Sequence, residues 1–417
     1  MKILLLIPYS PLQSAFGGAL RIRNILQILS ERYDVTVAGF GSNTDEEMLI
    51  RQFPQLTGRV HLVNKPEHSI YRRWMLLRSL FSSHSHWYYM TRSKELQVLI
   101  DDLTEKVPFD IIQSEFPVMA MFNVKGNGLR ILDAHNVEFH NFKRMSKIRN
   151  LFLSVYYRLE YRKFFKEEME AASAQHAIFT TSRDDLELFN RYLPHIPKFV
   201  IPNGVDLEKN AHLSNTKTDP ASIVFVGMMR YTPNHDAMSW FLDEIFPLIL
   251  KKVPQCKVYI VGKDPHRSIT SRASENVIVT GYLNEIRPVV QQSEVYIVPL
   301  RMGGGTRLKI LEALALKKPL VTTSIGCEGL DIFHNYNALV ADTAETFAEA
   351  VIELLNNKSL QQTLAENGYH TISAKYSWTV VGEQLHQTIN KITGNQPVSY
   401  DAEAPSGVNR AEILQPR

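Results

Sequence analysis

The segment 303–315, Gly-Gly-Gly-Thr-Arg-Leu-Lys-Ile-Leu-Glu-Ala-Leu-Ala, combines three glycines, two cations and one carboxylate. Glycines let the backbone approach a ligand closely, and the first free amides of a helix attract anions. We expect Thr306 to be the N-cap of a helix over 306–316, with two cations in a first turn whose dipole disfavours them unless an anion binds. The predicted phosphate site consists of Gly303, Gly304, Gly305, Thr306, Arg307 and Lys309. The alternative is a flexible glycine loop followed by two solvated basic residues.

Glu312 is the acidic member of this segment. It follows Leu308 and Leu311 at helical spacing, so its carboxylate lies on or beside the apolar stripe of the helix. A buried carboxylate is unfavourable unless it accepts hydrogen bonds, and the two hydroxyl groups of a ribose would supply them. The pattern therefore predicts nucleotide binding at Glu312, with an ion pair to Arg307 as the structural alternative.

A second glycine pair, Gly17-Gly18, follows the first apolar run and opens a helical segment that carries Arg21 and Arg23. The pair lacks the GxGxxG spacing of dinucleotide-binding proteins and the GxxxxGK[ST] spacing of P-loop kinases and ATPases, so both classes are disfavoured. We predict that Gly17 and Gly18 face a phosphate-bearing ligand, and a plain turn is the alternative.

Strands and helices must hold these residues in place, and the first half of the chain alternates between the two. The run 2–7 is apolar, as expected of a strand buried on both faces of a parallel sheet, and a helix over 19–32 and a strand over 34–40 follow it. This order makes a right-handed βαβ unit. Further strands are predicted at 60–63, 110–113, 130–132 and 176–180.

The second half repeats the pattern from residue 222. The predicted strands are 222–227, 257–261, 277–280, 295–299 and 319–322, and the predicted helices are 237–252, 285–292, 306–316 and 344–356. Short apolar strands that alternate with helices are typical of a parallel sheet. We therefore predict an α/β protein with two Rossmann-like, doubly wound parallel-sheet domains that face each other across a cleft, where such folds bind ligands.

The turn-forming sequence Pro202-Asn203-Gly204 places the junction between the halves near residue 201. The predicted organisation is an N-terminal domain over 1–200, a C-terminal domain over 201–378, a helix over 379–393 that packs back on the N-terminal domain, and a disordered tail over 394–417.

Composition narrows the classes of protein further. The 417 residues are 44% hydrophobic and 21% charged, which excludes a disordered or collagen-like chain, and a net charge of +3 gives no sign of a nucleic-acid partner. Cys256 and Cys327 form neither a disulfide framework nor a metal-ligand pattern. The apolar start is too short for a signal peptide or a membrane span. We expect a cytoplasmic protein with no bound metal or cofactor.

The motifs together carry a family resemblance. The second half resembles the donor domain of the retaining GT-B glycosyltransferases of family 4, and the first half resembles their acceptor domain, over residues 1 to about 393. The matching segments are 17–18, 133–138, 181–185, 201–206, 225–227, 277–282 and 303–313. The resemblance implies a GT-B fold with an acceptor-binding N-terminal domain and a donor-binding C-terminal domain.

Residue roles follow from the same resemblance. It places His135 nearest the chemistry, where it positions the donor sugar or the acceptor hydroxyl; taken alone, a histidine after a strand is more often a structural hydrogen-bonding residue. The implied catalytic residues are His135, Arg307 and Lys309, and the implied acceptor-side residues are Asp133, Asn136 and Glu138. The implied donor-binding residues are Gly17, Gly18, Gly227, Arg230, Tyr282, Gly303, Gly304, Gly305, Thr306, Arg307, Lys309 and Glu312.

The chain departs from the family pattern at two places. The family carries two glutamates separated by seven residues; the second corresponds to Glu312, but the first position is Gly304. The family also carries an arginine and a lysine spaced as GRxxxxK after the first donor-domain strand, which are absent after Gly227. We infer that Arg307 and Lys309 hold the diphosphate instead, with help from Arg230.

The activity that the resemblance implies is transfer of a sugar, with retention, from a UDP- or GDP-sugar to a glycan or lipid-linked acceptor in polysaccharide and cell-envelope biosynthesis. Helix amides and cations would stabilise the diphosphate as it leaves an oxocarbenium-like transition state. Three alternatives remain: a GT-B nucleotide-sugar epimerase, a sugar phosphorylase, and a catalytically silent partner that binds a nucleotide sugar.

Two stretches of the N-terminal half, 71–90 and 143–166, combine basic residues with Trp, Tyr and Leu. This combination suits an anionic membrane surface, so we expect peripheral association with the inner face of the plasma membrane. The alternative is a solvated helix face above ordinary core aromatics.

Overall fold

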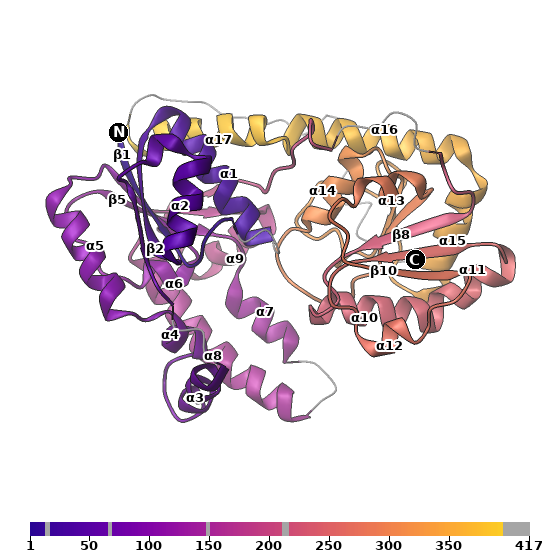
Figure 1. Cartoon of the computed structure of the whole chain (residues 1–417), viewed down its shortest axis with the longest axis horizontal. Helices are drawn as coiled ribbons and strands as arrows, with labels where there is room; N and C mark the ends of the chain where they lie inside the picture. The colour runs from indigo at the N-terminus through magenta and orange to yellow at the C-terminus, as the bar shows by residue number, and fades with distance from the viewer. Residues whose placement is uncertain (13–16, 66–68, 147–150, 211–216, 395–417) are drawn as a thin grey trace.

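The computed structural model of the chain describes residues 1–12, 17–65, 69–146, 151–210 and 217–394. Two parallel β-sheets, each covered by helices, lie beside one another, and two long C-terminal helices run across them (Figure 1). These two doubly wound sheets confirm the predicted fold class. The predicted disordered tail lies outside the described residues, apart from Gly394.

The first sheet has seven parallel strands in the order β3-β2-β1-β4-β5-β6-β7. The strands are β1 (Lys2–Ile7), β2 (Asp34–Phe40), β3 (Val60–Val63), β4 (Ile111–Glu115), β5 (Leu129–Ala134), β6 (Ala177–Thr180) and β7 (Lys198–Val200). Five consecutive apolar residues of β1 are fully buried because helices cover both faces of this sheet. The strand order reverses between β1 and β4, and such a reversal opens a crevice at the carboxyl ends of the strands.

The second sheet has six parallel strands in the order β10-β9-β8-β11-β12-β13. The strands are β8 (Ser222–Val226), β9 (Lys257–Val261), β10 (Val277–Gly281), β11 (Val295–Val298), β12 (Leu320–Thr322) and β13 (Leu339–Val340). The sequence analysis missed β7 and β13, which have three and two residues and are too short for a periodic pattern.

Helices join the strands of both sheets. In the first half they are α1 (Gly17–Arg32), α2 (Asn43–Gln52), η1 (Pro54–Leu56), α3 (Ser69–Leu80), α4 (His86–Thr91), α5 (Lys94–Lys106), α6 (Pro117–Ala120), α7 (Glu138–Met145), α8 (Leu151–Ser173) and α9 (Arg183–Tyr192). In the second half they are α10 (Thr232–Trp240), η2 (Phe241–Ile245), α11 (Phe246–Lys252), α12 (Arg267–Thr270), α13 (Arg287–Gln292), α14 (Leu308–Ala315), α15 (Ala344–Asn356), α16 (Lys358–Lys375) and α17 (Trp378–Ile392). Within the described residues, no helix is both long and apolar enough to cross a bilayer.

The helix predicted over 237–252 differs in the structure. It begins five residues earlier, at Thr232, and contains the π-helical turn η2 between α10 and α11. Pro247 lies at the start of α11 and has no N–H to donate, so the backbone shifts its hydrogen bonding just before it.

The chain crosses between the two sheets at two adjacent places. The linker after β7 and the junction of α16 with α17 pair with each other, because Val205 donates its N–H to the Tyr376 carbonyl at 2.7 Å and accepts from the Trp378 N–H at 3.2 Å. Beyond this junction, apolar residues of α17 enter the core of the first sheet, and α17 packs against α1. The last helix therefore belongs to the first sheet in space although it follows the second in sequence.

Arg21 of α1 joins the first sheet to the linker between the sheets. Its guanidinium is 1% exposed and binds Asp133 at the end of β5 through two hydrogen bonds of 2.8 and 3.0 Å. Its third nitrogen donates to the Pro202 carbonyl at 3.1 Å and to Asn203 Oδ1 at 3.2 Å. One buried side chain thus fixes a helix, a strand end and the interdomain linker.

We expect Arg21→Met to destabilise the first sheet by about 3–5 kcal/mol, because it leaves the Asp133 carboxyl group buried without its cation. Hydrogen exchange of the β1 and β5 amides measures this opening free energy for the first sheet alone. The control is Arg32→Met, which removes the exposed Arg32–Glu383 ion pair between α1 and α17 and should leave these amides unchanged. Equal protection in the two variants would contradict the role of Arg21.

Candidate functional site

The glycine loop runs from the end of β11 to α14, as predicted, but the helix begins two residues later than expected. Arg307 occupies the N-cap position, without a capping hydrogen bond from its side chain, and α14 starts at Leu308. Thr306 is therefore not the N-cap, which corrects the sequence prediction. Its hydroxyl instead accepts a hydrogen bond of 2.7 Å from the Asn203 side-chain amide, so an interdomain contact has replaced the local cap.

Arg307 is buried above this loop. Its Nη1 donates to the carbonyl oxygens of Gly304 and Gly305, whereas its Nη2 is buried and has no hydrogen-bond partner among the described residues. Burial lowers the pKa of the guanidinium. The side chain thus shapes the glycine loop with one nitrogen and keeps a donor for another acceptor with the other.

Lys309 lies next to Arg307 and is also enclosed. Its Nζ donates to Asn234 Oδ1 at 2.8 Å and lies 4.3 Å from the centre of the Phe225 ring. Burial, and then the nearby charge of Arg307, lower the pKa of this ammonium group to about 7. A Cβ atom at Gly227 would lie 2.8 Å from Nζ, so the glycine after β8 leaves room for the lysine.

Arg307 and Lys309 carry positive charges without a directly bonded counter-charge in the described structure. Across the described ranges, neither Arg307 nor Lys309 forms an ion pair with a carboxylate. Burying a cation is unfavourable unless an anion or several hydrogen bonds compensate it. Two such cations at the start of a helix form a site for a ligand that carries several negatively charged oxygens.

Glu312 lies one turn further along α14. It is half-buried, and burial raises the pKa of its carboxyl group. Among the residues that the structure describes, it has neither a hydrogen bond nor an ion pair, and the guanidinium of Arg307 points to the loop carbonyls instead. The ion pair with Arg307, which was the structural alternative, does not form, and the carboxylate remains available to hydroxyl donors.

The first domain contacts the glycine loop through two asparagines. A Cβ atom at Gly304 would lie 1.5 Å from Asn141 Oδ1, and one at Gly305, where φ is +69°, would lie 1.9 Å from Asn136 Oδ1. The position of the expected first glutamate therefore faces the side chain of Asn141, which would have to move to admit any larger residue there. This contact gives a physical reason for Gly304.

Helix α7 makes a second contact with the same loop. Arg144 forms a bidentate ion pair with Glu328 and donates a hydrogen bond of 3.1 Å to the Gly303 carbonyl. This ion pair joins residues 184 positions apart in the sequence. Together with Asn141, Arg144 fixes the face of the first domain against the glycine loop.

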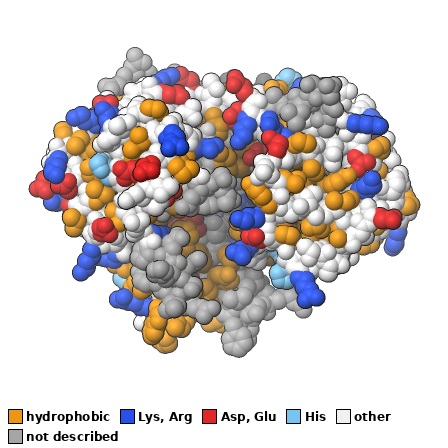
Figure 2. All heavy atoms as spheres, viewed as in Figure 1, with side chains coloured by type: hydrophobic (Ala, Val, Ile, Leu, Met, Phe, Trp, Pro, Cys, Tyr) orange, Lys and Arg blue, Asp and Glu red, His pale blue; other side chains and the backbone are white. Residues whose placement is uncertain are grey.

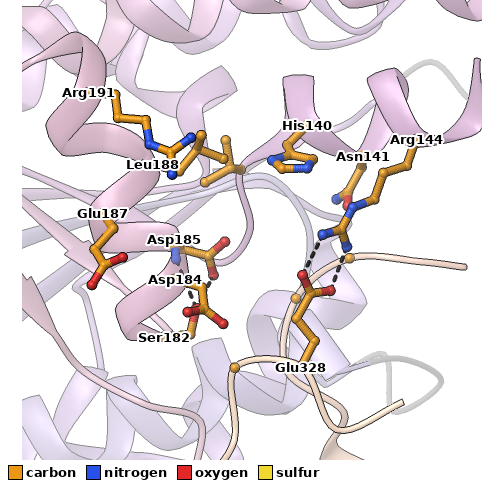
Figure 3. Close-up of a pocket in the computed structure, with 14 residues that line it drawn as sticks. His140, Asn141, Arg144, Ser182, Asp184, Asp185, Glu187, Leu188, Arg191 and Glu328 are labelled. Carbon is orange, nitrogen blue, oxygen red and sulfur yellow. Dashed lines mark hydrogen bonds and ion pairs between the residues drawn. The ribbon is translucent and has the colours of Figure 1, made fainter. Parts of the chain in front are cut away.

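A cavity of about 190 Å³ lies where α7 and α9 meet the loops of the second domain (Figure 3). His140 and Arg144 reach it from α7, and Glu187, Leu188 and Arg191 reach it from α9. Burial raises the pKa of the Asp185 carboxyl group in its wall to about 6. The remaining lining residues are Val137, Asn141, Ser182, Asp184, Gly304, Gly305, Glu328 and Gly329.

His135 belongs to a buried polar cluster below this cavity wall. Its Nε2 lies 2.7 Å from Glu115 Oε2 and 4.0 Å from Asp133 Oδ2, and its Nδ1 is buried without a partner in the described part of the chain. Burial lowers the pKa of His135 to about 3 and raises that of Glu115 to about 7. The imidazole is therefore neutral near pH 7 and is held by Glu115. The catalytic role of His135 stays a prediction.

The ligand atoms of Glu115, Asp133 and His135 lie within 4.8 Å of one another, a separation that could hold a metal ion. Arg21 already binds both oxygens of Asp133, and Glu115 is bonded to His135. These bonds would have to break before a metal could bind. The absence of a metal cofactor stays a prediction.

The other predicted residues lie in different surroundings. Arg230 is 81% exposed and forms an ion pair of 3.9 Å with Asp264, and its role at the diphosphate stays a prediction. Tyr282 is 66% exposed at the end of β10. Asn136 donates to the Glu138 carboxylate at 3.2 Å, which ties two predicted acceptor-side residues to each other.

The N-terminal glycine pair is close to α14. A Cβ atom at Gly17 would lie 2.9 Å from Leu308 Cδ1, and one at Gly18 would lie 2.3 Å from the Tyr9 hydroxyl and 3.1 Å from Phe116. Phe116 itself has a positive φ of 71° and stacks 3.9 Å from the His135 ring. Strained backbone at a bulky residue persists where its surroundings fix it, and such positions concentrate at functional sites.

Several residues of the site were missed by the sequence analysis. They are Glu115, Phe116, Asn141, Arg144, Asp185, Asn203 and Glu328. A carboxylate directly after an apolar strand could have indicated Glu115. The others act through contacts between distant segments, for which the local sequence gives no signal.

Comparison with known proteins agrees with this geometry. Residues 220–357 match the family described as glycosyl transferases group 1. An uncharacterized 44.6 kDa protein in the cps region of Klebsiella pneumoniae is 22% identical over 90% of this chain and 96% of its own length. The capsular polysaccharide biosynthesis glycosyltransferase CapM of Staphylococcus aureus is 22% identical over 36% of this chain and 41% of its own length.

A solved structure extends the likeness to the whole fold. The Anabaena protein HepE in complex with UDP-glucose has a TM-score of 0.66 and 14% identity, over 94% of this chain and all of that chain. The fold is therefore that of the GT-B glycosyltransferases. With the matched group 1 domain, it makes this chain a glycosyltransferase.

We expect Gly304→Ala to weaken the contact between the glycine loop and α7, because its Cβ would overlap the Asn141 side chain, which must then move. The thermal unfolding midpoint measures this effect, and we expect it to fall. Asn141→Ala should remove the overlap, so the alanine at 304 should be better tolerated in the double variant than alone. An equal effect of Gly304→Ala in both backgrounds would show that the two residues do not meet.

Proposed function

We propose that this glycosyltransferase transfers a sugar from a nucleoside-diphosphate sugar, UDP- or GDP-linked, to a hydroxyl group of a glycan or lipid-linked acceptor. The observation that carries the proposal is the pair of neighbouring cations, buried Arg307 and half-buried Lys309, neither of which forms an ion pair with a carboxylate among the described residues. A diphosphate supplies the missing charge at the start of a helix. The resemblance to family 4 and the matched group 1 domain support the same assignment.

The donor would lie along the first turns of α14. In this proposal the diphosphate accepts hydrogen bonds from Arg307 Nη2 and the free amides of the glycine loop, while Lys309 provides a second charge. Glu312, one turn further, accepts hydrogen bonds from the hydroxyl groups of the ribose. The structure of HepE with UDP-glucose supports a nucleotide sugar as ligand of this fold.

The chemical step breaks the bond between the anomeric carbon and the diphosphate oxygen and forms one to the acceptor oxygen, and the proton of the acceptor hydroxyl passes to the departing diphosphate oxygen. Negative charge grows on the departing diphosphate, and donors that are already oriented towards it stabilise this charge in a site that excludes water. Arg307, Lys309 and the helix amides can do this without a metal ion. Retention of the anomeric configuration is part of the proposal and follows from the family resemblance.

His135 contributes by position in this proposal. Its carbonyl accepts a hydrogen bond of 3.2 Å from Thr181 and lies 3.6 Å from the place of a Cβ atom at Gly305, so it supports the loop from the first domain. A neutral imidazole held by Glu115 can orient a sugar hydroxyl but is a weak base, because its pKa is about 3.

The acceptor would enter the cavity between α7 and α9. The carboxylates of Asp184, Asp185 and Glu187 in its wall can accept hydrogen bonds from several hydroxyl groups, which suits a glycan. CapM acts in capsular polysaccharide biosynthesis, and we propose a comparable role in envelope glycan assembly for this chain.

One observation favours a second candidate, a silent nucleotide-sugar-binding partner. The position of the first glutamate is glycine, and Asn141 fills the space beside it. Donor hydrolysis separates the two functions: the transferase releases UDP or GDP from a donor sugar during prolonged incubation, whereas the silent partner binds the donor and leaves it intact.

We expect Arg307→Ala to weaken UDP or GDP binding by about ten- to a hundredfold, the equivalent of one or two charge-assisted hydrogen bonds. Binding of uridine or guanosine should change little, because neither carries phosphate. Titration calorimetry measures both constants, with Arg32→Ala as the control that should match the unaltered protein, since Arg32 is an exposed residue of α1 that pairs with Glu383. An equal loss for nucleoside and diphosphate would refute the phosphate role.

Diphosphate binding should also take up a proton. The pKa of Lys309 is about 7 in the free protein, so at about pH 8 most of this amine is neutral, and a bound diphosphate raises its pKa and recharges it. Affinity should therefore fall as the pH rises above about 7.

Calorimetry in two buffers with different ionisation enthalpies counts the protons. We expect uptake that approaches one proton at about pH 8 in the unaltered protein and none in Lys309→Met. If both proteins took up the same number of protons, another group would be responsible.

A further inference from the structure

Helix α3 presents large apolar side chains to solvent. Trp74, Leu77 and Phe81 are 66%, 51% and 91% exposed, and their spacing places them along one side of the helix and its end. Monomeric soluble proteins rarely expose such a group of neighbours without a partner. We define the docking face by its exposed apolar residues: Trp74, Leu76, Leu77, Leu80 and Phe81 from the α3 segment, and Val155 and Leu159 from α8.

The docking face is anchored from behind by α8. Lys163 donates to the Ser79 carbonyl of α3, while Glu160 bonds to the backbone and ring of His86 at the start of α4. Glu167 accepts from the Ser85 N–H at 2.8 Å. These carboxylates lie inside the protein with their partners, so the helices are held in place and the acids of α8 near α3 do not reach its outer surface.

Among the described side chains of α3 and of residues 155–162 of α8, the exposed charged residues are Arg78, Arg158 and Arg162, all positive. From residue 68 to residue 93 the sequence contains four arginines and neither Asp nor Glu. On α8, Arg158 and Arg162 are exposed and alternate with Val155 and Leu159 at helical spacing. Figure 2 shows hydrophobic side chains gathered at the lower left of the molecule, over the α3 region of Figure 1, with Lys and Arg beside them.

We propose that the docking face binds the surface of an anionic lipid bilayer, with the aromatic and aliphatic side chains in the interfacial layer and the arginines on the lipid head groups. Aromatic residues next to cations are the side chains that favour this interface, and anionic head groups complement the charge. The partner is a membrane rather than an acidic protein, because large apolar side chains beside arginines match both the interfacial layer and the anionic head groups of a bilayer.

The location of the docking face links it to the cleft. Helix α8 follows α7 in the chain and packs against it, and α7 supplies Asn141 and Arg144 to the glycine loop. A lipid-linked acceptor could therefore keep its lipid in the bilayer beside α3 while its glycan reaches the cavity. This last step rests on the proposed function, whereas membrane docking does not.

Vesicle flotation of the full chain tests the docking. The protein should float with vesicles of phosphatidylcholine mixed with phosphatidylglycerol, float weakly with phosphatidylcholine alone, and lose binding as salt is added. The double variant Trp74→Ser/Phe81→Ser should abolish flotation, and Arg158→Gln/Arg162→Gln should reduce binding about fivefold for each charge removed. The matched control is Val98→Ser/Tyr336→Ser, which alters two apolar residues exposed elsewhere and should float normally.

Intrinsic fluorescence gives a second readout. Among the described tryptophans, Trp74 has the most exposed side chain. Its fluorescence emission should therefore shift to shorter wavelength on anionic vesicles, and this shift should disappear in Trp74→Phe. No flotation at low salt overturns the proposal. So does a dimer in sedimentation that Trp74→Ser/Phe81→Ser converts to monomer, because a second copy would then cover the face. UDP binding, measured in parallel, separates these outcomes from a failure of the proposed donor site.

Discussion

The hydrogen bonds of Arg21 hold the first domain to the linker that joins the two domains. A buried ion pair with Asp133 is unfavourable in itself, because both charges lose their water. Here Arg21 offsets that loss by also donating to Pro202 and Asn203, which lie in the linker. The Asn203 amide then donates to Thr306 in the glycine loop. A continuous hydrogen-bonded chain thus runs from the core of the first sheet to the candidate phosphate site on the second, and the linker is part of it rather than a loose hinge.

Close approach of backbone to side chain completes this contact. Gly304 and Gly305 allow two asparagines of the first domain to reach the loop, and Gly17 allows α14 to approach the first helix. The same lack of side chains that suits phosphate binding also lets the domains touch. The same short glycine loop is therefore expected to bind the donor sugar and also holds the two domains together.

The sequence alone predicted the two sheets and the two cations that follow the glycine loop, Arg307 and Lys309. Buried strands appear as apolar runs, and a glycine loop before a helix is a local pattern. Prediction from the sequence failed where a distant partner decided the outcome. Threonine is a common N-cap residue, yet the hydroxyl of Thr306 accepts a hydrogen bond from Asn203, 103 residues away. The helix begins only after Arg307. The Arg144–Glu328 pair joins two segments that no periodicity connects. The ion pair of the exposed Arg230 side chain with Asp264 likewise could not be read from the local sequence.

The glycine loop and the docking face differ in where their cations lie and in what compensates the charge. At the glycine loop, Arg307 is buried and Lys309 is half-buried, and neither forms an ion pair with a carboxylate among the described residues. Their loss of water is unfavourable in the free protein, an anionic ligand offsets it, and binding thereby stabilises the fold. On α8, Glu160 and Glu167 are buried with partners, so their charges are compensated inside and positive charge prevails outside. In the first case the missing partner is a small soluble anion that must enter a cleft. In the second, the uncompensated cations lie on an open apolar face, where only an extended anionic surface can meet all of them at once.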